Sequence, residues 1–134
     1  LIRLGHGDEI VIADGNFPAA STAAHCVTKE VIRLPGFTAT DAVELVTTLL
    51  PIDHLYEYGA LRMEIDGAPE RLGAVHAEVF AAIEKVAPAG THLKSLERQD
   101  FYARAKRAFA VVATTDERPF GCFILRTGVV FPDA

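Results

Sequence analysis

The feature that most constrains the fold is an unbroken apolar run near the start of the chain, Ile10-Val11-Ile12-Ala13. Turn residues bound it on both sides, Gly5-His6-Gly7-Asp8 before it and Asp14-Gly15 after it. An apolar run of this length between turn residues predicts a strand that is buried on both faces of a sheet. Polar residues that loops hold at the ends of such strands often form functional sites. His6 and Asp14 are therefore the first candidate site residues, and the plainer interpretation is that each only closes a turn.

Segments of strand and helix character alternate along the rest of the chain. Strands are expected over residues 9–13, 30–34, 61–65, 92–96, 109–114 and 120–125. Helices are expected over residues 19–24, 38–50, 70–86 and 99–108. This alternation predicts a single three-layer α/β/α domain over residues 1–134, with a mixed, largely parallel central sheet. Only residues 115–119 join the last two strands, a link that permits an antiparallel pair and no parallel crossover.

Two of the expected helices have clear sequence signals. Thr38 and Asp41 have the spacing of a capping box, and Pro51 ends the same helix. In the helix that follows, the apolar residues recur at helical spacing and predict one buried face. These residues are Leu72, Val75, Val79, Ile83 and Val86.

Composition argues against several classes of partner. The formal net charge of −5 lacks the basic excess that is typical of nucleic-acid binding. No window approaches the roughly 20 apolar residues of a membrane span, and no signal peptide is visible. Hydrophobic residues make up 50% of the chain, and a surplus of this kind often lies in subunit interfaces. Composition therefore argues against nucleic acid and a membrane as partners, and the hydrophobic surplus agrees with a homo-oligomer.

The cysteines and histidines show no disulfide or metal-binding pattern. Cys26 and Cys122 are isolated, which fits a reducing cytoplasm better than a disulfide scaffold. The spacing of His54, His76 and His92 is not that of metal ligands, so these residues are expected on helix faces or in loops. The sequence thus predicts a cytoplasmic protein without a metal site.

Several segments resemble one known family. Gly5-His6-Gly7-Asp8-Glu9, Ala13-Asp14 and Asn16-Phe17-Pro18-Ala19 are similar to the opening signature of the L-fucose mutarotase and D-ribose pyranase family. The segment from Phe101 to Thr114 resembles the fucose branch far more than the ribose branch. The order and spacing of segments match the family from Leu4 to about Val130, which is nearly the whole chain.

This resemblance implies a chemistry and an assembly. Family members interconvert the α and β anomers of a sugar by opening and reclosing its ring, without a redox cofactor or a metal. Their Gly-His-Gly histidine is the proton donor, which implies His6 as the catalytic residue. Histidine suits this role because its ordinary pKa of about 6.5 allows proton transfer near neutrality. Family members form homo-oligomers with the site completed at the subunit boundary. They also carry a preceding helix, of which Leu1 to Leu4 would be the tail.

The resemblance also implies a set of substrate-binding residues. Asp14 matches the sugar-binding aspartate, and Arg98 matches the fucose-branch arginine at a place where the ribose branch has histidine. Asp53 and Met63 fall where the fucose branch lines its pocket. Without the resemblance, Arg98 would be a solvated charge near a helix start, Asp53 a polar residue after a helix, and Met63 a core residue.

The last element of the implied site departs from the family pattern. The family has Tyr-x-Asn at the start of the final strand, and this chain has Phe120-Gly121-Cys122. Phe120 keeps the ring without the phenol, and Cys122 keeps little of the amide's hydrogen-bonding capacity. Tyr102 would share a helix face with Arg98 if the helix begins at Arg98, and could then supply a phenol. An interface role is the interpretation we favour for Tyr102.

Together these features predict an isomerase, a monosaccharide mutarotase that acts on L-fucose or a similar sugar. The mechanism requires His6 and Asp14 to face one polar hollow at the mouth of the first strand. Two alternatives use the same scaffold. One is a monosaccharide-binding protein without catalysis, and the other is a pyranase that acts on a different sugar.

Overall fold

A computed structural model describes residues 1 and 3–130 of the 134-residue chain. The strands in the described residues are β1 (Glu9–Ala13), β2 (Val31–Leu34), β3 (Ala60–Met63), β4 (Leu93–Leu96), β5 (Ala110–Thr114) and β6 (Phe123–Arg126). The helices in the same residues are α1 (Ala19–Ala23), α2 (Ala39–Thr47), α3 (Ala74–Val86) and α4 (Arg98–Ala105). No helix of this described part is long and apolar enough to cross a membrane.

One sheet joins all of these strands in the order β2-β5-β1-β6-β3-β4. Strand β1 pairs in parallel with β5 and antiparallel with β6. Strand β6 is also antiparallel to β3, while the β2–β5 and β3–β4 pairs are parallel. The prediction of a mixed, largely parallel sheet is therefore confirmed, with β6 as the one reversed strand among those described.

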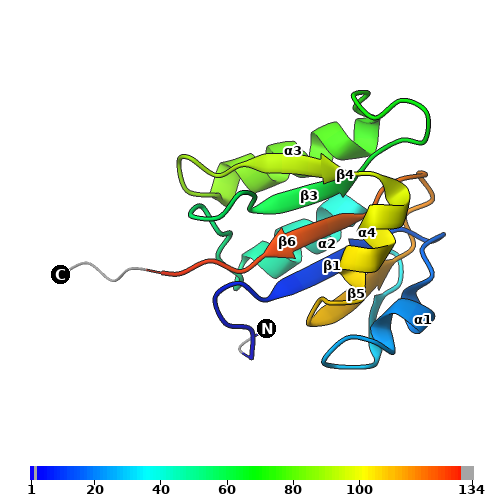
Figure 1. Cartoon of the computed structure of the whole chain (residues 1–134), viewed down its shortest axis with the longest axis horizontal. Helices are drawn as coiled ribbons and strands as arrows, with labels where there is room; N and C mark the ends of the chain where they lie inside the picture. Colours follow the sequence, from blue (N-terminus) through cyan, green and yellow to red (C-terminus); the bar gives the residue numbers. More distant parts are fainter. Residues whose placement is uncertain (2, 131–134) are drawn as a thin grey trace.

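Helices cover both faces of this sheet. Figure 1 shows α4 in front of the strands and α2 and α3 behind them. Residues of α2 and α3 join one hydrophobic core with Ile10 and Ile12, and residues of α1 and α4 join a second core with Val11 and Ala13. Because alternate residues of β1 belong to opposite cores, the whole strand is buried, as the unbroken apolar run predicted. The three-layer prediction is confirmed.

The start of α2 also follows its sequence signal. The Thr38 hydroxyl accepts a hydrogen bond from the Asp41 N–H at 3.1 Å, and the Asp41 carboxylate accepts one from the Thr38 N–H at 3.0 Å. Two N–H groups that the helix itself leaves unpaired are satisfied in this way.

Helix α3 begins later than predicted, at Ala74 rather than at residue 70. Gly73 is its N-cap, and the Gly73 N–H donates to Nδ1 of His76 at 3.0 Å. Leu72 precedes this cap and is 55% exposed, so its place in the apolar periodicity did not indicate a buried helical residue.

The last two strands do not pair with each other, because β1 lies between β5 and β6. The connection over residues 115–122 therefore crosses the carboxyl end of β1. Strand β6 also begins at Phe123 rather than at residue 120, because Phe120 has a left-handed backbone with φ of 59°. The crossing segment, residues 115–122, consequently forms one wall of a pocket instead of more sheet.

Candidate active site

A small pocket lies at the edge of the sheet where the parallel strands end. We call it the carboxyl-edge pocket. Its lining residues are Asp14, Asn16, Phe17, Met63, Arg98, Tyr102, Pro119, Phe120 and Cys122. Its volume of about 180 Å³ is below the ~300–1,000 Å³ of sites for drug-sized ligands, so it suits a small molecule. Five of the six predicted substrate-binding residues therefore lie together, and only Asp53 does not.

Asp14 is held at the base of this pocket by backbone groups. Oδ1 accepts a hydrogen bond from the Asn16 N–H at 2.9 Å, and Oδ2 accepts one from the Gly121 N–H at 3.1 Å. Each carboxylate oxygen has a second lone pair, so Asp14 can also accept hydrogen bonds from ligand hydroxyls. Its position is therefore fixed while its acceptor capacity remains available.

Asp14 is also a buried charge without a cation beside it. The residue is only 4% exposed, and no described lysine, arginine or histidine forms an ion pair with its carboxylate. Burial raises the pKa of Asp14 above its ordinary value, although the N–H groups of Asn16 and Gly121 act in the opposite direction. A carboxylate in this condition gains most from a ligand that donates hydrogen bonds to it.

Helix α4 places a cation and a phenol on the opposite wall. Arg98 is the first residue of α4, and its guanidinium lies 5.7 Å from the ring centre of Tyr102, one turn further on. Nε of Arg98 donates to the exposed Asp66 at 2.9 Å, which leaves its terminal nitrogens available to a ligand. The predicted shared helix face is confirmed, and Tyr102 lines the pocket.

The residues that replace the family's Tyr-x-Asn lie on the remaining wall. Phe120 presents its ring from a left-handed backbone position, a strained conformation for a residue other than glycine. The sulfur of Cys122 accepts a hydrogen bond from the Asp14 N–H at 3.5 Å. Burial raises the pKa of the Cys122 thiol well above its ordinary value, which favours the neutral thiol.

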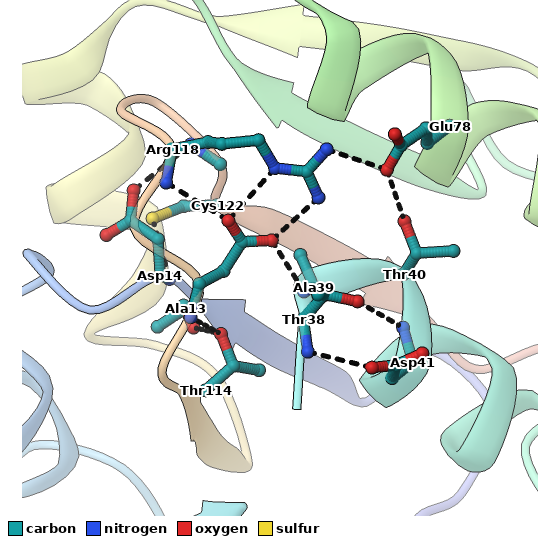
Figure 2. A network of polar contacts seen from close by, with 12 residues as sticks. Ala13, Asp14, Thr38, Ala39, Thr40, Asp41, Glu78, Thr114, Arg118 and Cys122 are labelled. Atoms are coloured by element: carbon teal, nitrogen blue, oxygen red, sulfur yellow. Dashed lines mark hydrogen bonds and ion pairs between the residues drawn. The ribbon is translucent and has the colours of Figure 1, made fainter. Parts of the chain in front are cut away.

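An ionic network holds the crossing segment in place (Figure 2). Asp116 accepts hydrogen bonds from two guanidinium nitrogens of Arg118, at 2.9 and 3.0 Å, and from the Ala39 N–H at the start of α2. Arg118 also pairs with Glu78 of α3 at 2.7 Å. The hydrogen bonds from Arg118 lower the pKa of Asp116 to about 2, against the effect of burial. The segment that carries Phe120 is thus tied to both helices of one face.

His76 of α3 supports the same segment. It is fully buried, and because Nδ1 accepts the Gly73 N–H, Nε2 carries the hydrogen and donates to the Phe120 carbonyl at 2.8 Å. The ring also packs edge-on against Phe123. His76 is therefore a structural histidine on a helix face, as predicted.

His6 lies at the opposite end of β1. It precedes the strand, Asp14 follows it, and five strand residues at about 3.3 Å each separate the two ends by roughly 17 Å. The prediction that His6 and Asp14 face one hollow is therefore wrong for a single chain. The physical reason is that a strand carries its two flanking turns to opposite edges of the sheet.

Asp53 belongs to the His6 end rather than to the pocket. Its Oδ2 lies 3.3 Å from Nε2 of His6 and accepts a hydrogen bond from Nε of Arg126 at 2.9 Å. The prediction that Asp53 lines the substrate pocket with Asp14 is thus wrong within one chain, because the loop before β3 is at the edge where β1 begins.

Further ion pairs extend this second group of residues. The Glu9 carboxylate accepts hydrogen bonds from two nitrogens of Arg104, each at 2.9 Å, and from Arg126 at 3.2 Å. Tyr58 also donates to Glu9. Burial opposes ionisation of Glu9, but these donors hold its pKa below the ordinary value. We call His6, Glu9, Asp53, Tyr58, Arg104 and Arg126 the His6 cluster.

Sequence reasoning missed part of the pocket wall and indicated no metal. Asn16 and Phe17 were not among the predicted site residues and an interface role was favoured for Tyr102, yet all three line the pocket. For Asn16 and Phe17 the signal was their position just beyond the end of β1, and for Tyr102 it was the helical spacing from Arg98. Across residues 1 and 3–130 no group of three or more His, Cys, Asp or Glu side chains is placed to hold a metal ion.

A three-layer α/β domain with a largely apolar pocket that contains a few polar groups, at the carboxyl edge of parallel strands, is of the class that binds small molecules there. The chain belongs to the RbsD / FucU transport protein family, whose model matches residues 1–130.

Named relatives agree with this assignment. The chain is 42% identical to the fucose mutarotase of Homo sapiens over 133 residues, which cover 97% of this chain and 84% of the relative. Its fold matches that of a protein described as a putative sugar binding protein, with a TM-score of 0.91, 35% identity, and coverage of 96% and 85%. It also matches the crystal structure of the fucose mutarotase in complex with L-fucose from Streptococcus pneumoniae. That match has a TM-score of 0.84 and 31% identity, and covers 97% of this chain and 89% of the other.

Proposed function

We propose that this chain is a mutarotase that interconverts the α and β anomers of L-fucose. The observation that carries the proposal is the carboxyl-edge pocket, in which the buried Asp14 carboxylate, without a cation beside it, shares one cavity with Arg98 and Phe120. The identity of 42% with a fucose mutarotase supports the choice of sugar.

The reaction needs two proton transfers and no change of oxidation state. In ring opening, the bond between the anomeric carbon and the ring oxygen breaks. The ring oxygen receives a proton, and the anomeric hydroxyl loses one to form the aldehyde. Reclosure on the other face of the aldehyde reverses both transfers. A positioned acid–base group accelerates such steps by typically ~10²–10⁴-fold.

Each pocket residue has a role that its chemistry fits. Asp14 accepts hydrogen bonds from sugar hydroxyls, and the terminal nitrogens of Arg98 donate to sugar oxygens. Phe120 and Met63 cover the apolar face of the sugar ring. His6 transfers the protons, since it is a half-exposed imidazole with a carboxylate behind it.

His6 and Asp14 can act on one sugar only if they come from two copies of the chain. We infer a homo-oligomer in which His6 of one copy reaches the carboxyl-edge pocket of the next. Leu55 and Tyr56 support this inference, because these large apolar residues follow Asp53 and are 60% and 38% exposed. The expected oligomer would cover them.

We also infer the domain organisation, the partners and the compartment of this protein. Residues 1–134 constitute one domain, because both hydrophobic cores pack on a single sheet. The ligand is a monosaccharide, and neither nucleic acid nor a membrane is a partner. The compartment is the cytoplasm, an assignment supported by Cys26 and Cys122, which are both free thiols.

Exchange NMR with L-fucose tests the activity. Cross-peaks between the two anomer signals should grow faster with the protein than in buffer alone. Binding of L-fucose without faster exchange would contradict the proposal and favour a sugar-binding protein. The same measurement with D-ribose compares the two branches, and faster exchange for ribose would contradict the choice of sugar.

Co-assembly of two inactive variants tests the shared site. His6→Ala subunits keep the pocket, and Arg98→Ala subunits keep the imidazole. Random mixing of equal amounts should restore about a quarter of the sites. Each site takes its imidazole from one subunit and its arginine from the next, and each group is intact in half of the subunits. No recovery, with mixed oligomers present, would contradict the two-copy site. Mixing each variant with itself is the control.

A further inference from the structure

The turn that carries His6 is held firmly in place. The Gly7 N–H donates to the Thr127 carbonyl at 2.8 Å, and the Thr127 N–H donates to the Asp8 carbonyl at 2.8 Å. Asp8 also accepts a hydrogen bond from the Gly5 N–H through its side chain. Gly7 has φ of +87°, and a Cβ there would lie 3.0 Å from a guanidinium nitrogen of Arg126. The backbone that presents the imidazole is therefore fixed beside the end of β6.

The Nε2 atom of the His6 imidazole faces the Asp53 carboxylate. Nε2 of His6 is 3.3 Å from Oδ2 of Asp53, and the His6 side chain is 48% exposed. A carboxylate oxygen only accepts hydrogen bonds, so the ring nitrogen that faces it is the one that carries hydrogen. In neutral His6 the lone pair then lies on Nδ1.

We propose that Asp53 is a positioning residue that holds His6 in the Nε2–H tautomer, so that Nδ1 is the atom that exchanges protons with the substrate. This inference rests on the proposed mutarotase function and assigns Asp53 a role other than substrate binding. Asp53 contacts the proton-transferring side chain and lies outside the carboxyl-edge pocket of its own chain.

The surroundings of Asp53 keep it an ionised acceptor. Its side chain is fully buried, its Oδ1 accepts the Leu55 N–H at 2.9 Å, and its Oδ2 accepts Nε of Arg126 at 2.9 Å. Burial would raise the pKa of Asp53, but these donors and the nearby His6 together hold it below its ordinary value. Glu9 and the face of the Tyr56 ring hold Arg126 in turn, and Asp8 is the other charged residue of the His6 turn.

Two glycines bring other parts of the chain against the Asp53 backbone. A Cβ at Gly59 would lie 2.4 Å from the Asp53 carbonyl oxygen, and a Cβ at Gly128 would lie 2.8 Å from the Asp53 Cα. The Asp53 N–H also donates to the Arg126 carbonyl at 3.0 Å. Such close backbone packing is what a residue needs in order to orient another side chain.

With this arrangement, His6 alone can carry out both proton transfers of ring opening. Nδ1 of neutral His6 accepts the proton of the anomeric hydroxyl and becomes N–H, which gives an imidazolium with hydrogen on both nitrogens. The Asp53 carboxylate stabilises this cation through Nε2. Nδ1–H then donates its proton to the ring oxygen, which leaves His6 neutral and the sugar open.

The nitrogen-15 shifts of the His6 ring give the direct test, because they distinguish the two neutral tautomers without any measurement of activity. In its neutral form, the His6 ring of the wild-type protein should be the Nε2–H tautomer. In Asp53→Asn only one oxygen remains: if it accepts from the Leu55 N–H, the NH₂ group faces Arg126 and Nε2 of His6. We expect a shift toward the Nδ1–H tautomer and a fall in kcat/KM of about 10- to 100-fold.

Asp116→Asn is the matched control, since Asp116 is also a buried aspartate paired with an arginine. It should leave the His6 tautomer unchanged. A wild-type His6 that is mainly Nδ1–H would overturn the proposal even if Asp53→Asn does not fold. So would a folded Asp53→Asn protein with unaltered ring shifts or unaltered kcat/KM. Absence of anomer exchange in the wild type would remove the proposed function, while the tautomer result would still stand.

Discussion

The two ends of β1 hold their buried carboxylates in opposite ways. At the His6 end, Glu9 pairs with Arg104 and Arg126, and Asp53 pairs with Arg126. Both carboxylates have pKa values below the ordinary range, because their donors outweigh burial. At the other end, Asp14 has no cation beside it, and burial raises its pKa. The difference indicates that Asp14 is the carboxylate that a ligand would bind.

The same contrast holds within the pocket end itself. Asp116 is as buried as Asp14 but has Arg118 beside it, and it connects the crossing segment to α2 rather than facing the cavity. Arginine-paired carboxylates support the structure at both ends of the sheet. A buried carboxylate that lacks a cation is instead the expected mark of a binding site.

The largest effect should come from removing the imidazole. His6→Ala should lower the rate of anomer exchange by ~10²–10⁴-fold, the usual share of an acid–base group. The side chain is half-exposed, so the free energy of unfolding should change by about 0.5 kcal/mol or less. Exchange NMR and thermal unfolding measure the two effects. His25→Ala, at another exposed histidine, is the control, and unchanged exchange in His6→Ala would remove His6 from the mechanism.

Neutralising the carboxylate of the pocket should mainly weaken binding. Asp14→Asn loses charge-assisted hydrogen bonds to the sugar, each worth about 1.5–3 kcal/mol, so kcat/KM should fall about 10- to 100-fold through KM. Steady-state rates over a range of L-fucose concentrations separate KM from kcat. A fall confined to kcat would mean that Asp14 acts on the reacting atoms instead.

The two kinds of buried aspartate should show opposite dependence of stability on pH. The folded pKa of Asp116, about 2, is below its ordinary 3.8, so its contribution is present above 3.8 and is lost as pH falls toward 2, by roughly 2 kcal/mol in all. The folded pKa of Asp14 is raised, so its contribution is greatest below the ordinary pKa and is lost as pH rises through the folded value.

Denaturant unfolding of Asp116→Asn and Asp14→Asn between pH 2 and 7, each compared with the wild type, measures this contrast. The deficit of Asp116→Asn should grow as pH rises, and that of Asp14→Asn should shrink. Parallel curves for the two variants would contradict the distinction between paired and unpaired carboxylates.

The smallest effect should come from restoring the phenol. Phe120→Tyr should raise kcat/KM by about 2- to 10-fold if the added hydroxyl reaches a sugar oxygen, as a hydrogen bond of about 0.5–1.5 kcal/mol allows. Phe80→Tyr, on α3 and outside the pocket lining, is the control. No gain from Phe120→Tyr would indicate that another group, such as Tyr102, already occupies that role.

The sequence predicted best those features that depend on neighbouring residues. The apolar run predicted the bounds of β1 without error, and the Thr38–Asp41 spacing predicted its capping box. The helix predicted from about residue 99 begins at Arg98, and the predicted condition for Tyr102 to share a face with Arg98 is met. Each of these features depends on interactions within one or two turns of chain, so periodicity and capping chemistry are sufficient to find it.

The features that depend on strand order were missed. The separation of His6 from Asp14 and the contact of His6 with Asp53 both follow from which strands are neighbours. Residues 115–119 indicated a reversed last strand, but nothing local showed that β1 would lie between β5 and β6. The late start of β6 depends on the backbone conformation of Phe120, which its residue type does not favour.

The placement of His6 and Asp14 at opposite edges of the sheet has a consequence for how this catalyst responds to dilution. If each sugar needs groups from two copies, a dissociated subunit carries both groups and yet has no working centre. Activity per milligram should then fall at protein concentrations below the dissociation constant of the assembly and recover on concentration, by mass action.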